Sequence, residues 1–285
     1  MGPALAVLAS LAWGWSTHEA ARGAGRLGSL RLTAWSQASG LLILIPCFVL
    51  SGEQLEWRGV LAGAAAGVGS GWSLALLYDA CTRMAAGPAS GVSGAGAGVF
   101  TLLVVTLSGA GWSPVAAISM VPCVVGILLV SLPEGRADPL ASIDWRPFPT
   151  IEAFASGFLM TIYYVALGNT DTPLESILVA RLVASAFLFA ALRRTMTRAG
   201  TRIQPGVSWI WPVLSVGISG SFGTIAYSLA ATRMSTVASV AIAATAPAVT
   251  GGLGFLRYGD RLRPAQIAGL GACIVGAGLA SLSAA

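Results

Sequence analysis

Few residues of this chain have side chains that could do chemistry, and those few lack the spacing that enzymes use. There is one histidine, His18, and the four cysteines stand far apart with no CxxC pair. Neither a metal site nor a disulfide framework is therefore predicted. The HExxH, GxSxG and P-loop motifs are absent, so the sequence predicts no enzyme, no cofactor and no ATP hydrolysis by this chain.

Charged residues inside apolar segments are the stronger signal, because a charge within a membrane is costly to bury. Arg181 lies about seven residues into the predicted helix 174–193, roughly 10 Å along its axis. Arg181 could bind a substrate carboxylate. The alternative is a structural role, in which its guanidinium reaches the interface or satisfies neighbouring helix ends.

A second group of ionisable residues stands at the ends of two predicted helices. His18 and Glu19 close the helix 3–20, and Asp79 closes the helix 59–79. These helices run in the same direction, so all three side chains emerge at one membrane face. If Glu19 is partly buried, its carboxylate is a candidate for taking up and releasing a proton during transport. Otherwise Glu19 is a solvated loop residue beside Arg22.

Aromatic residues are the third candidate set. Aromatic walls hold amphipathic or aromatic solutes by stacking and by cation–π contact, although Trp and Tyr also gather at membrane interfaces. The candidates for the wall of a substrate cavity are Trp13, Trp15, Trp35, Trp72, Tyr78, Tyr163, Tyr164 and Tyr227.

The composition determines which elements must position these residues. Hydrophobic residues make up 55% of the chain and charged residues 9%, which is typical of an integral membrane protein. The net charge of +5 comes from arginines in the predicted loops, which indicates membrane orientation and not nucleic-acid binding. At about 20 residues per crossing, the chain is long enough for ten helices. They are predicted at 3–20, 31–50, 59–79, 86–108, 114–132, 152–168, 174–193, 209–230, 235–256 and 264–283.

The two halves of the sequence resemble each other at an offset of 150 residues. Thr82-Arg83-Met84 aligns with Thr232-Arg233-Met234, Arg31 with Arg181, and Pro114 with Pro264. The predicted organisation is a five-helix repeat at 1–133, a polar linker at 134–150 and a second repeat at 151–285. Five helices is an odd number, so the repeats must be inverted, which is typical of secondary transporters that bind substrate between the halves.

Glycines recur every four residues in the predicted helix 59–79, at Gly63, Gly67 and Gly71. This spacing predicts either a helix packing seam or a cavity-lining helix.

Several segments together resemble the EamA family of the drug/metabolite transporter superfamily. They are Trp13-Gly14-Trp15-Ser16, the two tyrosines Tyr78 and Tyr227, and Gly259-Asp260-Arg261-Leu262-Arg263-Pro264-Ala265-Gln266 followed by Gly269 and Gly276. The resemblance implies a ten-helix permease with inverted repeats, often an exporter of amino acids or related metabolites and sometimes of drugs. The sequence departs from the family by having Asp260 in place of the usual Glu and Ala110 at the matching first-half position.

The arginine distribution predicts an orientation in the inner (plasma) membrane of the cell. Loops after odd-numbered helices hold most of the arginines, whereas those after even-numbered helices hold only Arg58 and Arg233. Positive loops stay in the cytoplasm, so both termini are predicted to lie outside. Better-known members of the family place both termini in the cytoplasm, so the two arguments disagree.

These observations lead to two hypotheses for function. The first is a carrier, monomeric or homodimeric, that moves a small-molecule substrate across the lipid bilayer by alternating access. The second is a membrane scaffold or lipid-handling accessory subunit that transports nothing. Loss of Trp13 and Tyr163 should abolish solute affinity in a carrier and be tolerated in a scaffold.

Overall fold

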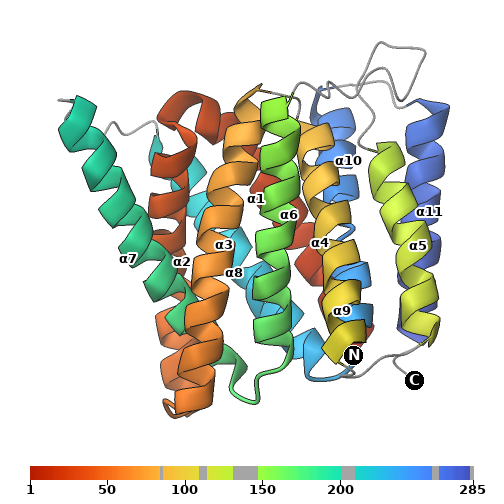
Figure 1. The fold of residues 1–285 in the computed structure, drawn as a ribbon, viewed down its shortest axis with the longest axis horizontal. Coiled ribbons are helices and arrows are strands. Elements are labelled where there is room, and N and C mark those ends of the chain that lie inside the picture. Colours follow the sequence, from red (N-terminus) through yellow and green to blue (C-terminus); the bar gives the residue numbers. More distant parts are fainter. Residues whose placement is uncertain (84–85, 109–113, 131–146, 200–208, 259–262, 283–285) are drawn as a thin grey trace.

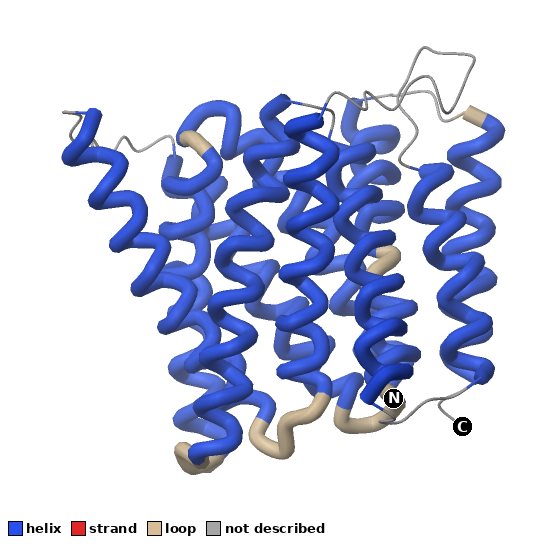
Figure 2. The backbone as a smooth tube through the Cα atoms, viewed as in Figure 1, coloured by secondary structure: helices blue, strands red, loops and turns tan. Residues whose placement is uncertain are grey.

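The chain folds into a bundle of helices that run roughly side by side (Figures 1 and 2). This computed structural model describes all residues except 84–85, 109–113, 131–146, 200–208, 259–262 and 283–285. Within the described ranges every regular element is a helix. The predicted all-α class is therefore confirmed.

The helix order follows the predicted one closely. The first half contains α1 (Gly2–Leu27), α2 (Ser29–Ser51), α3 (Trp57–Arg83), α4 (Ala86–Ser108) and α5 (Pro114–Val130). The second half contains α6 (Pro147–Gly168), α7 (Pro173–Ala199), α8 (Ile210–Ala231), α9 (Thr236–Ala243), α10 (Ala246–Tyr258) and α11 (Pro264–Leu282). The one difference in number is the predicted helix 235–256, which is divided into α9 and α10.

Helix length and composition identify a multi-pass membrane protein. Within the described ranges, seven segments are long and apolar enough to span a bilayer: α2, α3, α4, α6, Pro173–Met196 of α7, α8, and Thr236–Gly254 across α9 and α10. The helices α5 and α11 contain shorter apolar stretches, Ala117–Leu129 and Pro264–Ala277. The helix α1 is long, but its last turns carry His18, Glu19 and two arginines.

Glycines end two of the helices, because only glycine adopts positive φ without strain. Gly28 has φ 82° and its N–H donates to the carbonyl of Ala24, so α1 ends at Leu27, later than the predicted residue 20. Gly52 has φ 70° in the left-handed region and ends α2. The longer α1 brings His18 and Glu19 inside a helix, where both side chains are buried.

The glycines of α3 form a packing seam against α7. A methyl group on Gly63 would come within 2.5 Å of the carbonyl oxygen of Ser176, and one on Gly67 equally close to that of Ala180. Such contacts leave no room for any side chain, so the two backbones touch directly. Of the two interpretations of this glycine repeat, the structure supports the packing seam.

The helices of the two halves interleave. α1 packs against α8, α3 against α6 and α7, α2 against α7 and α8, and α4 against α6. α5 and α11 pack along each other at one edge of the bundle (Figure 1). α1 begins and α11 ends at the same end of the bundle, the lower end in Figure 1.

Charged side chains differ between the two ends. The upper end in Figure 1, where α1, α3 and α7 end, carries most of the described arginines: Arg22, Arg26, Arg31, Arg83, Arg193, Arg194 and Arg263. The lower end carries Arg58 and Arg233 with the acidic residues Glu53, Glu56, Asp171 and Glu175. The bundle is thus polarised along its helix axes.

Candidate functional site

A cavity lies in the middle of the bundle, between helices of both halves. Its volume is about 90 Å³. Its first-half lining comes from α1, α2, α3 and α4, and its second-half lining from α6, α7, α8 and the α9–α10 break. This is the candidate binding site. The lining residues used below are Trp13, Ser16, Gln37, Tyr78, Tyr163, Tyr164, Arg181, Gly220, Thr224 and Pro247.

Arg181 is the one charged residue among those that line the cavity in the described chain. It stands eight residues after the start of α7 at Pro173, or roughly 12 Å along the helix axis, and only 8% of its surface is exposed. Its guanidinium donates to Oε1 of Gln37 and, at 3.4 Å, to Oγ1 of Thr224. No described carboxylate lies within ion-pair distance of it. Among the described residues, Arg181 is therefore a buried cation whose hydrogen-bond partners are neutral.

Gln37 is the partner that orients Arg181. It lies in the middle of α2, is completely buried and lines the cavity. While its Oε1 accepts from Arg181, its Nε2 has no hydrogen-bond partner. A buried amide donor without an acceptor costs free energy. Gln37 carries no charge and is not among the predicted site residues, although a glutamine within an apolar segment is a signal that the sequence contains.

Hydroxyl groups complete the polar side of the cavity. Thr224 of α8 hydrogen-bonds with the hydroxyl of Tyr163 and donates to the carbonyl of Gly220, 2.9 Å away. Ser16 of α1 donates to the carbonyl of Val216 at 3.1 Å. The bond of Ser16 joins α1 to α8, and the bond of Tyr163 joins α6 to α8, so these hydroxyls hold three helices together at the cavity.

Aromatic rings from α1 and α6 also line the cavity. The ring of Trp13 lies 6.2 Å from that of Tyr163 and 5.7 Å from that of Tyr164, both of α6, measured between centroids. The indole N–H of Trp13 donates to the carbonyl of Gly220 at 3.2 Å. A side chain at Gly223 would collide with this indole, so the glycine lets Trp13 lie flat against α8.

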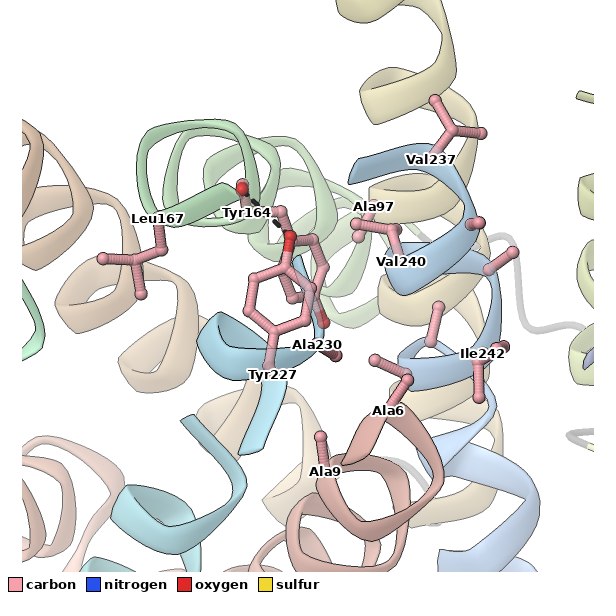
Figure 3. Close-up of a cluster of buried hydrophobic side chains, with 14 of the residues drawn as sticks. Ala6, Ala9, Ala97, Tyr164, Leu167, Tyr227, Ala230, Val237, Val240 and Ile242 are labelled. Atoms are coloured by element: carbon pink, nitrogen blue, oxygen red, sulfur yellow. Dashed lines mark hydrogen bonds between the residues drawn. The ribbon is translucent and has the colours of Figure 1, made fainter. Parts of the chain in front are cut away.

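Tyr227 lies behind this aromatic wall and does not line the cavity. It is completely buried, and its hydroxyl donates to the carbonyl of Tyr164 at 3.0 Å (Figure 3). Ala6 and Ala9 of α1 and Val240 of α9 belong to the same apolar cluster. Tyr227 therefore supports the wall from the core side.

Three of the predicted tryptophans lie elsewhere. Trp15 donates its indole N–H to Ser215 at 3.0 Å. Trp35 packs against the rings of Phe189 and Trp209, near one end of the bundle. Trp72 stacks on Phe187 with 43% of its surface exposed. The cavity thus contains five of the nine predicted binding residues: Trp13, Tyr78, Tyr163, Tyr164 and Arg181.

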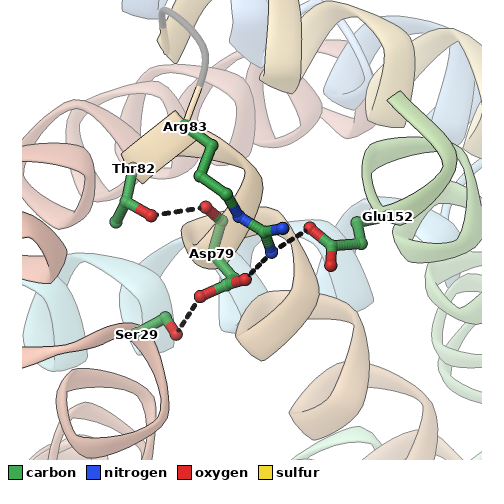
Figure 4. Close-up of polar contacts among 5 residues, drawn as sticks. All are labelled: Ser29, Asp79, Thr82, Arg83 and Glu152. Carbon is green, nitrogen blue, oxygen red and sulfur yellow. Dashed lines mark hydrogen bonds and ion pairs between the residues drawn. The ribbon is translucent and has the colours of Figure 1, made fainter. Parts of the chain in front are cut away.

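The three predicted proton-coupling residues lie outside the cavity lining. His18 and Glu19 are buried in α1, and Glu19 comes within 4.0 Å of Arg22. Asp79 accepts from Ser29 and pairs with Arg83, which also pairs with Glu152 of α6 (Figure 4). Asp79 is thus part of an ion network that joins α3 to α6. Asp260 and Ala110 lie outside the described residues, as does most of the linker 134–150.

The helix break between α9 and α10 also faces the cavity. Pro247 has no N–H to donate to the carbonyl of Ala243, and its ring disfavours a continuous helix there. The chain bends through Ala244 and Thr245, and Ala243, Ala244, Ala246 and Pro247 line the cavity. Irregular backbone at membrane depth is tolerated where it lines a cavity. The predicted helix 235–256 contains Pro247 and is wrong at this point, because the hydropathy of the segment gives no sign of the break.

The described residues contain no group of His, Cys, Asp and Glu that could hold a metal ion. The chemistry that the cavity offers is therefore that of a cation, neutral hydrogen-bond donors and aromatic rings.

The fold and cavity define a class: a multi-pass helical membrane protein with a largely apolar cavity, lined in part by an arginine, within its bundle. Comparison adds the family. The model of the EamA-like transporter family matches residues 150–282, so this part of the chain is similar to that family. The predicted family resemblance is confirmed, and the match spans the second predicted repeat.

Structure comparison extends the likeness in fold to almost the whole chain. A solved crystal structure of another protein superposes with a TM-score of 0.77 at 17% sequence identity, covering 99% of this chain and 96% of that one. At this identity the likeness shows the fold alone. No curated protein matches the sequence.

Proposed function

We propose that this chain is a secondary carrier that moves small organic metabolites across a membrane by alternating access. One observation carries the proposal: the cavity that encloses Arg181 is lined by helices of both halves. A site between two halves can open to either face if the halves rock around it. Similarity of residues 150–282 to a transporter family supports the same conclusion.

Reciprocal helix contacts support the inverted repeat on which this mechanism depends. If α1 corresponds to α6 and α3 to α8, the contact of α1 with α8 has its counterpart in the contact of α6 with α3. The contact between α5 and α11 is reciprocal at the residue level. Gly126 lies against Cys273, and Gly276, 150 residues later, lies against Cys123.

Contacts between the halves at both ends of the bundle are consistent with gating. At the upper end, Arg83 of α3 pairs with Glu152 of α6. At the lower end, the backbone N–H of Glu175 in α7 donates to Glu53 at 2.9 Å, and that of Glu56 donates to Glu175 at 2.6 Å. These two carboxylates cap helix N-termini across the halves. Alternating access requires the contacts at the upper end and those at the lower end to break in turn.

The charge polarity of the bundle supports an orientation. We place the arginine-rich end in the cytoplasm, which puts both termini outside. Reporters fused after Ala285 test this orientation. A reporter that works only outside the cytoplasm should be active there, whereas activity of a reporter that works only in the cytoplasm would contradict the orientation.

The test is solute exchange by purified protein in liposomes. Preloaded liposomes should exchange at least one labelled metabolite class across a broad panel, and Trp13→Ala should abolish that exchange because it removes the centre of the aromatic wall. Trp72→Ala is the matched control, since it truncates a half-exposed tryptophan away from the cavity. If no solute exchanges, or both variants behave like the unmodified protein, the non-transporting scaffold becomes the better explanation.

A further inference from the structure

The cavity holds hydrogen-bond donors that nothing else in the described chain satisfies. Arg181 has five N–H groups, of which two have partners, the oxygen atoms of Gln37 and Thr224. The Nε2 amide of Gln37 is completely buried and has no acceptor. Two neighbouring side chains that line one cavity thus present donors and a positive charge without an anion.

From this donor pair we infer that the cavity binds small organic monocarboxylates in preference to neutral, cationic or zwitterionic solutes, an inference that rests on the proposed carrier function. A carboxylate has two acceptor oxygens in one plane, which matches the fork of an arginine. It can accept from Arg181 and from Nε2 of Gln37 together. The bound anion then supplies the countercharge that Arg181 lacks in the described chain.

The rest of the lining selects the body of the solute. Trp13, Tyr164, Leu74 and Met160 also line the cavity and present apolar or aromatic surface, which suits a carbon skeleton and not an inorganic ion. Chloride could satisfy the charge but would leave this surface unused.

The described lining residues offer few groups that could bind an ammonium group. No Asp or Glu is among the described lining residues, so an amine would depend on the faces of Trp13 and Tyr164. At the short range and low polarity of a membrane interior, repulsion from Arg181 outweighs such a contact. This argument separates monocarboxylates from amino acids and from cationic drugs.

Equilibrium binding to the purified full chain in detergent tests the inference without requiring transport. Three probes share a phenyl body: phenylacetate, phenylacetamide and 2-phenylethylammonium. Calorimetric titration should give phenylacetate an affinity about 10- to 100-fold above phenylacetamide, the range that a hydrogen bond to a charged group contributes. The cation should bind most weakly. Chloride should compete with phenylacetate only at far higher concentration.

Variants assign the preference to the donor pair. Arg181→Gln should bring phenylacetate down to the affinity of phenylacetamide while phenylacetamide binding persists, which also reports that the cavity is folded. Gln37→Glu should have the same effect, because the new carboxylate would pair with Arg181 internally. Arg233→Gln is the matched control, since Arg233 is exposed in the turn between α8 and α9. If Arg181→Gln does not fold, Arg181→Lys and Gln37→Glu carry the test.

Equal affinity of the unmodified protein for phenylacetate and phenylacetamide overturns the inference, as does failure of all three probes to bind. It is also overturned if Arg181→Gln keeps the preference or if Arg233→Gln loses it. Labelled phenylacetate in the liposome assay separates the two proposals. Binding with the expected charge preference but no exchange counts against the carrier, whereas exchange of amines or neutral solutes alone counts against the carboxylate site.

Discussion

The two halves of the chain meet at an edge and at the centre of the bundle, and these two contacts differ in chemistry. At the edge, α5 and α11 approach through Gly126 and Gly276, with the thiol of Cys273 lying 3.9 Å from the carbonyl of Cys123. At the centre, the facing groups include the guanidinium of Arg181 and the amide of Gln37.

Under the proposed function, this difference separates the contact that holds the protein together from the contact that binds a ligand. Lipid tails are as apolar as side chains, so helices in a bilayer associate by close packing of small residues. Buried charges reduce stability unless they are fully paired. The edge contact is therefore expected to contribute stability, and the central one to give up some stability for binding.

Substitution at the edge contact should have the largest effect on stability. A methyl group at Gly126 would come within 2.6 Å of the carbonyl oxygen of Gly269, which belongs to the backbone and cannot move alone. Gly126→Ala should lower the free energy of unfolding by about 1–3 kcal/mol, measured by thermal unfolding in detergent. Gly276→Ala should cause a similar loss if the two-fold relation between the halves holds.

Gly271→Ala is the matched control for the edge, because nothing lies within 4 Å of a methyl group there. It should leave stability unchanged or raise it by up to about 1 kcal/mol, since alanine favours helix more than glycine does. A Gly126→Ala variant as stable as Gly271→Ala would contradict a tight edge contact.

Removal of a helix cap at the lower end should have an intermediate effect. The carboxylate of Glu53 accepts from the backbone N–H of Glu175 at the start of α7. Glu53→Ala should therefore cost about 1 kcal/mol, seen as a lower midpoint of thermal unfolding. Glu56→Ala serves as the control because only its backbone takes part in the contact with Glu175. Equal losses in the two variants would show that the Glu53 carboxylate is no cap.

The smallest loss of stability is expected for Arg181→Met at the centre. Leaving Oε1 of Gln37 without a donor costs about 1–3 kcal/mol, but removing a buried, unpaired charge recovers several kcal/mol in the usual case. The unfolding midpoint should stay unchanged or rise, while exchange of carboxylates in liposomes is lost. A fall in stability as large as that of Gly126→Ala would make Arg181 a structural residue.

Much of the fold could be predicted because apolar runs and charged breaks are local signals. The predicted helices match the observed ones in order, but α6 begins at Pro147 and not at residue 152, and α7 ends at Ala199 and not at residue 193. An apolar segment hides the break near Pro247, and α1 continues past the predicted residue 20 up to Gly28. A proline and a glycine determine these last two differences.

The candidate site was predictable in part. Arg181 and the aromatic residues stood out by type, but Trp72 and Tyr227 could not be told from Trp13 by sequence, because all three lie in apolar helices. Which face of each helix meets the cavity depends on how α1, α3, α6 and α8 are rotated against one another. Gln37 is part of the candidate site because it contacts Arg181, which the sequence does not show.

The sequence by itself determined that this chain is a helical membrane protein with a charge set deep in one helix, because hydropathy and the cost of burying a charge act residue by residue. Only the tertiary structure decided that Arg181 meets Gln37 in a cavity between the halves without a carboxylate beside it. That arrangement depends on contacts of α7 with α2 and α8, and Arg181 and Gln37 are 144 positions apart in the sequence. No local sequence pattern encodes such a contact.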